Sequence, residues 1–138
     1  MTQALHFGRT AAIALVCLLA LDVPWLLSTT EALYRPALAA HLAPSPDLSA
    51  ALLFYLIYAI GLTALAIRPN ETMASWRSSL WRGAVFGLVA YATYDLTNQA
   101  TLSHWPWSLT VIDMVWGTIL SGLSAAAAAA ASGWIAKR

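Results

Sequence analysis

Four long stretches of the chain are almost wholly apolar, and short polar segments that contain proline separate them. The stretches cover residues 10–27, 48–67, 79–98 and 109–134. About 20 helical residues cross a hydrocarbon core of about 30 Å, and a backbone in lipid must satisfy its own hydrogen bonds. The pattern therefore predicts an all-α integral membrane four-helix bundle in which residues 1–138 form a single transmembrane domain.

The connection between the first two stretches has a pattern of its own. Residues 28–31, a Ser-Thr-Thr-Glu run, resemble the start of a helix. Their hydroxyl groups can cap free backbone amides, and the acid lies near the positive end of the helix dipole. These residues predict a short surface helix between spans 1 and 2, which ends before the turn at residues 43–46.

The composition agrees with a lipid environment. Of the 138 residues, 60% are hydrophobic and 9% are charged, whereas about a quarter of the residues in soluble domains are charged. The net charge of +1 provides no basic surplus to neutralise phosphates, so membrane lipid is an expected partner and nucleic acid is not. The single cysteine, Cys17, lies in an apolar stretch and excludes an intramolecular disulfide.

The basic residues fall on one side of the membrane if the chain crosses it four times. Arg35 is the exception, because it follows the first crossing. Basic residues favour the cytoplasmic side, so the pattern predicts that both termini are cytoplasmic. The residues on that side are Arg9, Arg68, Arg77, Arg82, Lys137 and Arg138.

Three aspartates in the outer halves of the predicted spans are the candidates for chemistry: Asp22, Asp95 and Asp113. A carboxylate in a spanning helix is costly and normally faces the bundle interior, a partner or water. Asp95 and Asp113 lie near helix ends, where capping or contact with interfacial water explains them equally well. Asp22 lies deeper, which favours a functional role.

Helical spacing places polar and aromatic side chains beside these acids. Tyr91 and Asp95 share a face of the third predicted helix, and Asp113 and Trp116 share a face of the fourth. If the faces converge, they line an outward-opening pocket. A polar network that only holds the helices together fits the same pattern, since one interhelical hydrogen bond contributes about 0.6 to 2 kcal/mol. The predicted ligand-binding residues are Tyr55, Tyr58, Tyr91, Tyr94, Asn98 and Trp116.

Other residues complete this prediction. Arg35 and His104 are expected at the mouth of the pocket. No histidine or lysine lies within a predicted span, which argues against haem or retinal in the bilayer, and the cysteine and histidine spacing fits no zinc site. The sequence therefore predicts no cofactor and no metal.

Several segments resemble a bacterial family of membrane proteins. They read YATYDLTNQATL at residues 91–102 and TVIDMVWG at residues 110–117, with Leu21-Asp22 near the start of the chain. These motifs resemble domain-of-unknown-function family 2177 (DUF2177) over nearly the whole chain. Gln99 departs from the family pattern, in which a small or apolar residue is expected. The resemblance implies a small four-helix protein of the bacterial inner membrane, and it implies no activity.

The layout is also similar, at the level of the fold, to the emopamil-binding and sterol-isomerase proteins, which enclose a lipid-like ligand in a polar-floored cavity. This similarity favours a protein that binds or modifies a small apolar molecule, such as a lipid, a sterol-like compound or an isoprenoid. The aspartates would then serve as polar anchors or transfer protons. Whether the protein is an enzyme stays open.

Two alternatives belong to other classes. A structural or accessory subunit would pair with a membrane protein partner or with a second copy, through the close-packing spacing of Gly83 and Gly87. A proton or ion pathway would use the intramembrane acids. The inner halves of the spans offer few polar residues for such a pathway, chiefly Thr63, Ser121 and Ser124.

Overall fold

The computed structural model describes residues 2–39, 42–71 and 75–136, and every regular element within them is helical. The elements are α1 (Gln3–Thr29), η1 (Thr30–Tyr34), α2 (Arg35–Leu38), α3 (Leu48–Leu62), η2 (Thr63–Ile67), α4 (Trp76–Thr101) and α5 (Trp107–Ala136). The segments η1 and η2 are π-helical turns that extend α1 and α3. The predicted all-α helical bundle is confirmed.

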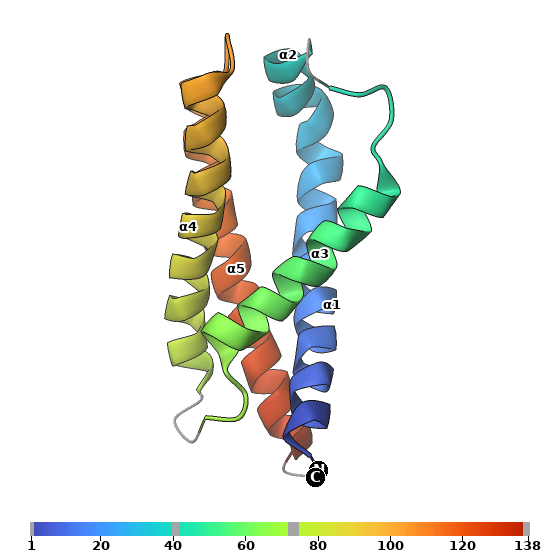
Figure 1. Cartoon of the computed structure of the whole chain (residues 1–138), viewed down its shortest axis with the longest axis vertical. Helices are drawn as coiled ribbons and strands as arrows, with labels where there is room; N and C mark the ends of the chain where they lie inside the picture. The colour runs from blue at the N-terminus through green and yellow to red at the C-terminus, as the bar shows by residue number, and fades with distance from the viewer. Residues whose placement is uncertain (1, 40–41, 72–74, 137–138) are drawn as a thin grey trace.

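The long helices run alternately up and down, so both ends of the chain lie at the same end of the bundle (Figure 1). We call the half of the bundle at that end the terminal half and the other the distal half. The helices α1, α4 and α5 lie close to the long axis (Figure 1). In contrast, α3 crosses the bundle obliquely, so that its Leu48 end lies away from α4 and its other end lies close to α4 (Figure 1).

Three helical runs among the described residues are long and apolar enough to cross a membrane: Gln3–Leu38, Leu48–Ile67 and Trp107–Ala136. The remaining predicted span, α4, is not among them, because polar residues such as Arg82, Asp95 and Asn98 lower its hydropathy. It nevertheless lies alongside α5 over most of its length (Figure 1).

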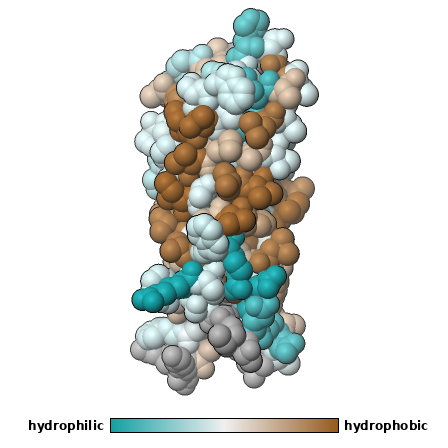
Figure 2. Space-filling model, turned by 90° about the vertical axis from the view of Figure 1, so that its left-hand side faces the viewer, coloured by the Kyte–Doolittle hydropathy of each residue, from teal (hydrophilic) through white to brown (hydrophobic). Residues whose placement is uncertain are grey.

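The outward side of α4 is apolar. Val85, Leu88 and Val89 are exposed, whereas Ser79 and Asp95 are buried. Figure 2 looks at the α4 side of the molecule and shows a broad band of hydrophobic side chains, with hydrophilic ones toward the terminal end. Ser79 and Asp95 of α4 therefore face the bundle, while exposed positions in the middle of the helix are apolar.

The helix that begins with α1 does not end where the sequence pattern predicts. Residues 28–31 were expected to cap a new helix, but the chain continues without a break through η1 and α2 to Leu38. The hydroxyls of Ser28 and Thr29 donate to the carbonyl of Trp25, at 2.9 and 2.7 Å. Hydroxyl groups that bond back to the preceding turn fit inside a helix, so the predicted cap is wrong.

Small residues bring α4 and α5 together in the terminal half. A Cβ atom at Gly83 would lie 2.6 Å from the carbonyl oxygen of Ser121 and 2.7 Å from the Cβ of Ala125. A Cβ atom at Gly87 would meet the carbonyl oxygen of Gly117. The glycine spacing thus serves contact within the chain, and the prediction that this face meets another protein is wrong because α5 covers it.

A closed ring of hydrogen bonds holds the turn between α4 and α5. The Gln99 amide donates to the Trp105 carbonyl at 3.0 Å, the Trp105 indole donates to the Thr110 hydroxyl at 3.1 Å, and that hydroxyl donates to Gln99 Oε1 at 3.1 Å. Gln99 is the residue that departs from the family pattern. In this chain its side chain satisfies polar groups in a turn whose Trp105 is buried.

Candidate functional site

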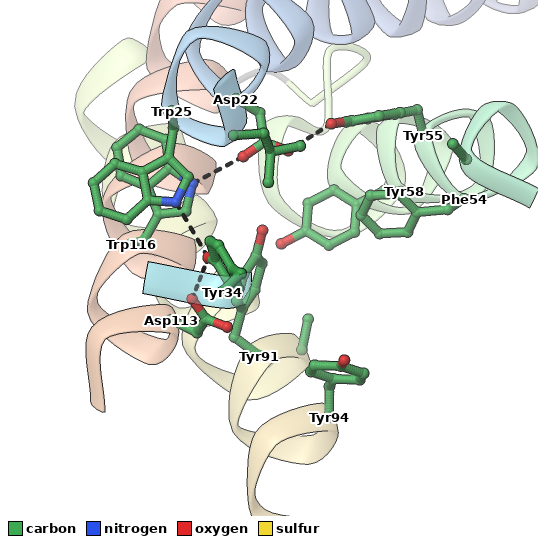
Figure 3. A pocket seen from close by; sticks show the side chains of 13 residues that line it. Asp22, Trp25, Tyr34, Phe54, Tyr55, Tyr58, Tyr91, Tyr94, Asp113 and Trp116 are labelled. Atoms are coloured by element: carbon green, nitrogen blue, oxygen red, sulfur yellow. Dashed lines mark hydrogen bonds between the residues drawn. The ribbon is translucent and has the colours of Figure 1, made fainter. Parts of the chain in front are cut away.

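A cavity with a volume of about 600 Å³ lies in the distal half, between α1, η1, α3, α4 and α5. Eight of its thirteen lining residues are aromatic and two are aspartates (Figure 3). The lining consists of Asp22, Trp25, Leu26, Tyr34, Ala51, Phe54, Tyr55, Tyr58, Ala90, Tyr91, Tyr94, Asp113 and Trp116.

The tilt of α3 creates this space. In the middle of the bundle α3 touches α4, where the rings of Tyr58 and Phe86 meet edge to face at 5.2 Å, and a Cβ at Gly61 would lie 3.3 Å from Phe86. Beyond this point α3 leans away from α4 (Figure 1). Ala51 on α3 and Ala90 on α4 then line the gap with the smallest side chains of the site.

Asp22 is the first polar centre of the cavity. Its Oδ2 accepts a hydrogen bond from the Tyr55 hydroxyl at 2.6 Å, and its Oδ1 accepts one from the Trp116 indole N–H at 2.8 Å (Figure 3). The side chain is only 5% exposed. Asp22 therefore links three helices, since Tyr55 belongs to α3 and Trp116 to α5.

Asp113 is the second polar centre. Its Oδ1 accepts a short hydrogen bond of 2.5 Å from the Tyr34 hydroxyl, and that hydroxyl oxygen accepts one from the Trp25 indole N–H at 3.3 Å. An indole N–H can only donate, so the hydroxyl proton of Tyr34 is free to point at the carboxylate. The unbroken helical run through η1 places Tyr34 over the cavity.

Two stacked indole rings connect the centres. The rings of Trp25 and Trp116 lie nearly parallel, with an angle of 9° between their planes and 4.3 Å between their centroids. One of these indoles donates to Asp22 directly and the other reaches Asp113 through Tyr34 (Figure 3). The stacked indoles therefore link the two carboxylates through one set of contacts.

Tyr91 enters the cavity from α4 because Gly117 makes room for it. A Cβ atom at Gly117 would overlap the ring of Tyr91. Figure 3 shows Tyr91 pointing into the cavity beside Tyr34 and Tyr58. The structure gives a role to a glycine that the sequence pattern placed only on the same helix face as Asp113.

The cavity is closed on the side of the terminal half. One turn beyond Asp22, Tyr58 and Trp116 on their own helices lie Leu18, Leu62 and Leu120, which are 0 to 2% exposed. The hydroxyls of Tyr58 and Ser121 share a hydrogen bond of 2.7 Å at the edge of this layer, since Ser121 directly follows Leu120 on α5. The layer separates the cavity from the polar residues near the termini.

Seven of the nine candidate residues predicted from sequence line the cavity: Asp22, Asp113, Tyr55, Tyr58, Tyr91, Tyr94 and Trp116. Asp95 and Asn98 lie outside its lining, and so do Arg35 and His104, which were expected at its mouth. Arg35 instead pairs with Glu31 on the surface at 2.8 Å. The predicted place of these four residues in the site does not fit the geometry.

Asp95 has an unusual environment. It is 0% exposed, and neither carboxylate oxygen has a hydrogen-bond partner among the described residues. It belongs to the stripe of α4 that faces α5, together with Ser79, Gly83 and Gly87. Asp95 therefore forms no stabilising pair with the described residues, and its burial is costly.

Sequence reasoning missed three aromatic residues of the lining: Trp25, Tyr34 and Phe54. Trp25 had a usable signal, since it follows Asp22 by three residues and therefore shares its helix face. Phe54 lies next to Tyr55 and would be assigned to another face. Tyr34 falls in the segment that was expected to leave the bundle as a separate surface helix.

The site has no evident place for a metal ion. Within residues 2–39, 42–71 and 75–136, no three His, Cys, Asp or Glu side chains come together closely enough to hold one. The chemistry that the lining offers consists of two carboxylates, phenol and indole groups, and a large aromatic surface.

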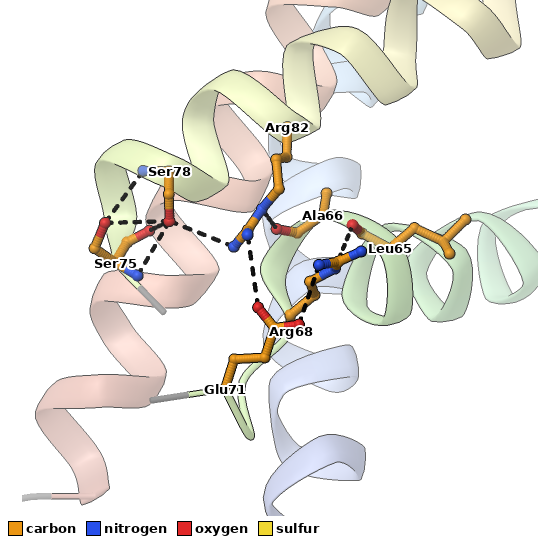
Figure 4. A network of polar contacts seen from close by, with 7 residues as sticks. All are labelled: Leu65, Ala66, Arg68, Glu71, Ser75, Ser78 and Arg82. Atoms are coloured by element: carbon orange, nitrogen blue, oxygen red, sulfur yellow. Dashed lines mark hydrogen bonds and ion pairs between the residues drawn. The ribbon is translucent and has the colours of Figure 1, made fainter. Parts of the chain in front are cut away.

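A polar network in the terminal half fixes the other end of α3. Arg82 of α4 donates to the carbonyl of Ala66 in η2 at 2.8 Å and to the Ser78 hydroxyl at 3.3 Å, and it lies 3.7 Å from Glu71 (Figure 4). Arg68, with a left-handed φ of 52°, ends η2 and pairs with Glu71 at 3.1 Å. These contacts hold α3 against α4 at one end only, which leaves the distal end free to diverge.

Comparison of the sequence with known protein families identifies the family of this chain. The family model described as "Predicted membrane protein (DUF2177)" matches residues 9–130. The chain belongs to this family. The match confirms the resemblance and the assignment as a membrane protein, and it covers every residue of the cavity lining. The chain matches no curated protein and no solved structure.

Proposed function

We propose that this DUF2177 protein binds one small, largely apolar molecule with a polar end, which it takes from the membrane into the cavity of the distal half. The observation that carries the proposal is the cavity of about 600 Å³, whose lining is aromatic except for two alanines, a leucine and two aspartates. Ligand sites are typically cavities of about 300 to 1,000 Å³ with apolar walls and a few placed polar groups.

The divergence of α3 from α4 supports entry from the side. Phe54 on α3 and Tyr94 on α4 both line the cavity, and they are 45% and 57% exposed. In a bilayer these residues face lipid, so an apolar ligand can pass between the two helices without crossing water. The polar end of the ligand then reaches Asp22 and Asp113.

The placement in the membrane follows from the same proposal. All four long helices cross, with α4 as the fourth, because the exposed side chains in the middle of α4 include Val85, Leu88 and Val89 and because α4 accompanies α5. The described basic residues of the terminal half, Arg9, Arg68, Arg77 and Arg82, favour a cytoplasmic terminal end. Lys137 and Arg138, which support the same orientation, lie outside the described residues. The cavity then occupies the outer leaflet of a bacterial inner membrane.

An apolar layer below the cavity supports binding over ion conduction. Leu18, Leu62 and Leu120 form an apolar layer below the cavity. A proton or ion path needs polar groups on both sides of such a layer and through it. The geometry therefore favours a site that opens toward one leaflet.

Native mass spectrometry of the gently purified protein, followed by extraction of bound compounds, tests this function. We expect one defined apolar compound on the wild type, and its loss or marked reduction in Asp22→Asn. Asp47→Asn is the matched control, because Asp47 caps α3 in an exposed position outside the cavity. Wild-type protein that carries only bulk phospholipid, in the same amount as both variants, would contradict the proposal.

A further inference from the structure

We infer that the polar end of the bound molecule carries a positive charge, as a substituted or quaternary ammonium group, and that this group lies between Asp22, Asp113 and the aromatic walls. The inference rests on the proposed function, because it names the class of ligand for the same cavity. It follows from the charges of the lining, from the direction of its hydrogen bonds and from the nature of its walls.

The lining contains two carboxylates and no basic side chain. The described arginine of the distal half is Arg35, and its guanidinium is bound to Glu31 through two hydrogen bonds of 2.8 and 2.9 Å. The other described arginines lie in the terminal half, beyond the apolar layer. The cavity thus has negative groups and no counter-charge of its own among the described residues.

The side chains around both carboxylates donate hydrogen bonds to them. Both oxygens of Asp22 accept, one from an indole and one from a phenol, and Asp113 accepts from Tyr34. Indole N–H groups cannot accept a hydrogen bond, so a proton on Oδ1 of Asp22 would face the donor Trp116. Such donors stabilise an anion without neutralising it, and a cationic ligand would supply the missing charge.

The walls suit a cation as well. Trp25, Tyr34, Tyr55, Tyr58, Tyr91 and Trp116 surround the carboxylates with aromatic rings. The faces of such rings attract ammonium groups, most strongly where water is excluded, and cages of this kind recognise quaternary ammonium ligands. A neutral apolar ligand would gain from the area of these rings but not from their charge distribution or from the aspartates.

Three probes with the same tail separate these cases: dodecyltrimethylammonium, dodecanol and dodecanoate. An equimolar mixture is added to the purified protein in a neutral maltoside detergent, and the adducts are counted by native mass spectrometry. We expect the ammonium probe to exceed the alcohol by about tenfold, the preference that a cation gains over aromatic faces and a carboxylate. Dodecanoate should bind least.

The variants decide whether the charge of the site causes this preference. Asp22→Asn should reduce the preference for the ammonium probe toward that for the alcohol, whereas Asp47→Asn should keep it. If Asp22→Asn does not fold, Asp113→Asn provides the same test. Equal binding of ammonium and alcohol in the wild type would overturn the charge inference and leave the proposed function standing. Absence of every probe from the wild type would contradict both.

Discussion

The two halves of the bundle differ in how their helices meet. In the terminal half, Gly83 and Gly87 let the backbones of α4 and α5 touch, and Arg82 fastens η2 to α4. In the distal half α3 leaves its neighbours, and aromatic rings and two aspartates line the space that results. The comparison indicates that one half carries the packing that fixes the fold, which allows the other half to keep a cavity.

The largest expected effect comes from closing the gap between α4 and α5. In Gly87→Ala the new Cβ would meet the Gly117 carbonyl and lie 2.5 Å from the Ser121 hydroxyl, and a backbone cannot move aside easily. We expect a loss of about 1 to 3 kcal/mol in the free energy of unfolding, as is usual for overpacking. Unfolding in a denaturing detergent measures it.

A control within α5 makes this test specific. A Cβ at Gly133 would have no atom within 4 Å, so Gly133→Ala should leave the free energy of unfolding unchanged or raise it slightly through helix propensity. If both substitutions had the same effect, the close contact at Gly87 would not be a determinant of stability.

A glycine-to-alanine change beside the cavity, Gly117→Ala, should reduce ligand binding more than stability. In Gly117→Ala the added methyl group displaces Tyr91, a side chain that can move into the cavity. We expect a smaller loss of stability than for Gly87→Ala and a clear loss of the copurified ligand. Native mass spectrometry and unfolding on the same samples separate the two effects. Retention of the ligand at full level would contradict a role of Gly117 in shaping the cavity.

Asp95 provides a further test, because it is buried and neither of its carboxylate oxygens has a hydrogen-bond partner among the described residues. Replacing such a group by an apolar one of similar size removes a desolvation cost, so Asp95→Leu should match or exceed the wild type in the free energy of unfolding. A detergent unfolding curve tests this. A marked loss of stability would mean that Asp95 has a structural partner in the folded protein.

The smallest effect concerns Asp47, which caps α3 where the helix diverges. The Ser49 hydroxyl and then the backbone amides of Ala50 and Ser49 lower the pKa of Asp47 from its ordinary value. A lowered pKa in the folded state stabilises the protein above the unfolded-state pKa, and this contribution is lost as the pH falls through the folded-state pKa. We therefore expect Asp47→Ala to be less stable than the wild type near neutral pH, with the difference closing in acid.

The variant Asp47→Asn controls for the titration. Asparagine caps a helix about as well as aspartate but does not titrate there. Its stability relative to Asp47→Ala should stay nearly constant with pH. A difference between wild type and Asp47→Ala that widened toward low pH would contradict the assigned role of the carboxylate.

The helix ranges followed closely from the sequence. The predicted span at residues 48–67 coincides with α3 and η2, because an uninterrupted apolar run between Asp47 and the turn at Arg68 leaves little choice. The helix boundary predicted at residues 28–31 was wrong, because hydroxyl side chains serve equally as caps and as donors to the preceding turn.

Much of the candidate site also followed from the sequence, because position in the predicted spans placed Asp22, Asp113, Tyr55, Tyr58 and Tyr91 in the same half of the bundle. The tilt of α3 could not be predicted, because packing against neighbours sets tilt and a hydrophobic length alone does not. Without that tilt the cavity cannot be derived. Tyr34 was missed for another reason, because the first helix was expected to end before it. Helical position alone could not show that Asp113 lines the cavity and Asp95 does not, because packing against neighbouring helices decides this.

A pair of adjacent substitutions on α4 tests the central claim, that the gap between α3 and α4 holds the ligand. Ala90 lines the cavity, whereas its neighbour Val89 points away and is 60% exposed. The measurement is the amount of copurified ligand on Ala90→Trp and on Val89→Trp. We predict that Ala90→Trp folds and loses the ligand while Val89→Trp retains it. Equal retention by both variants would contradict the claim.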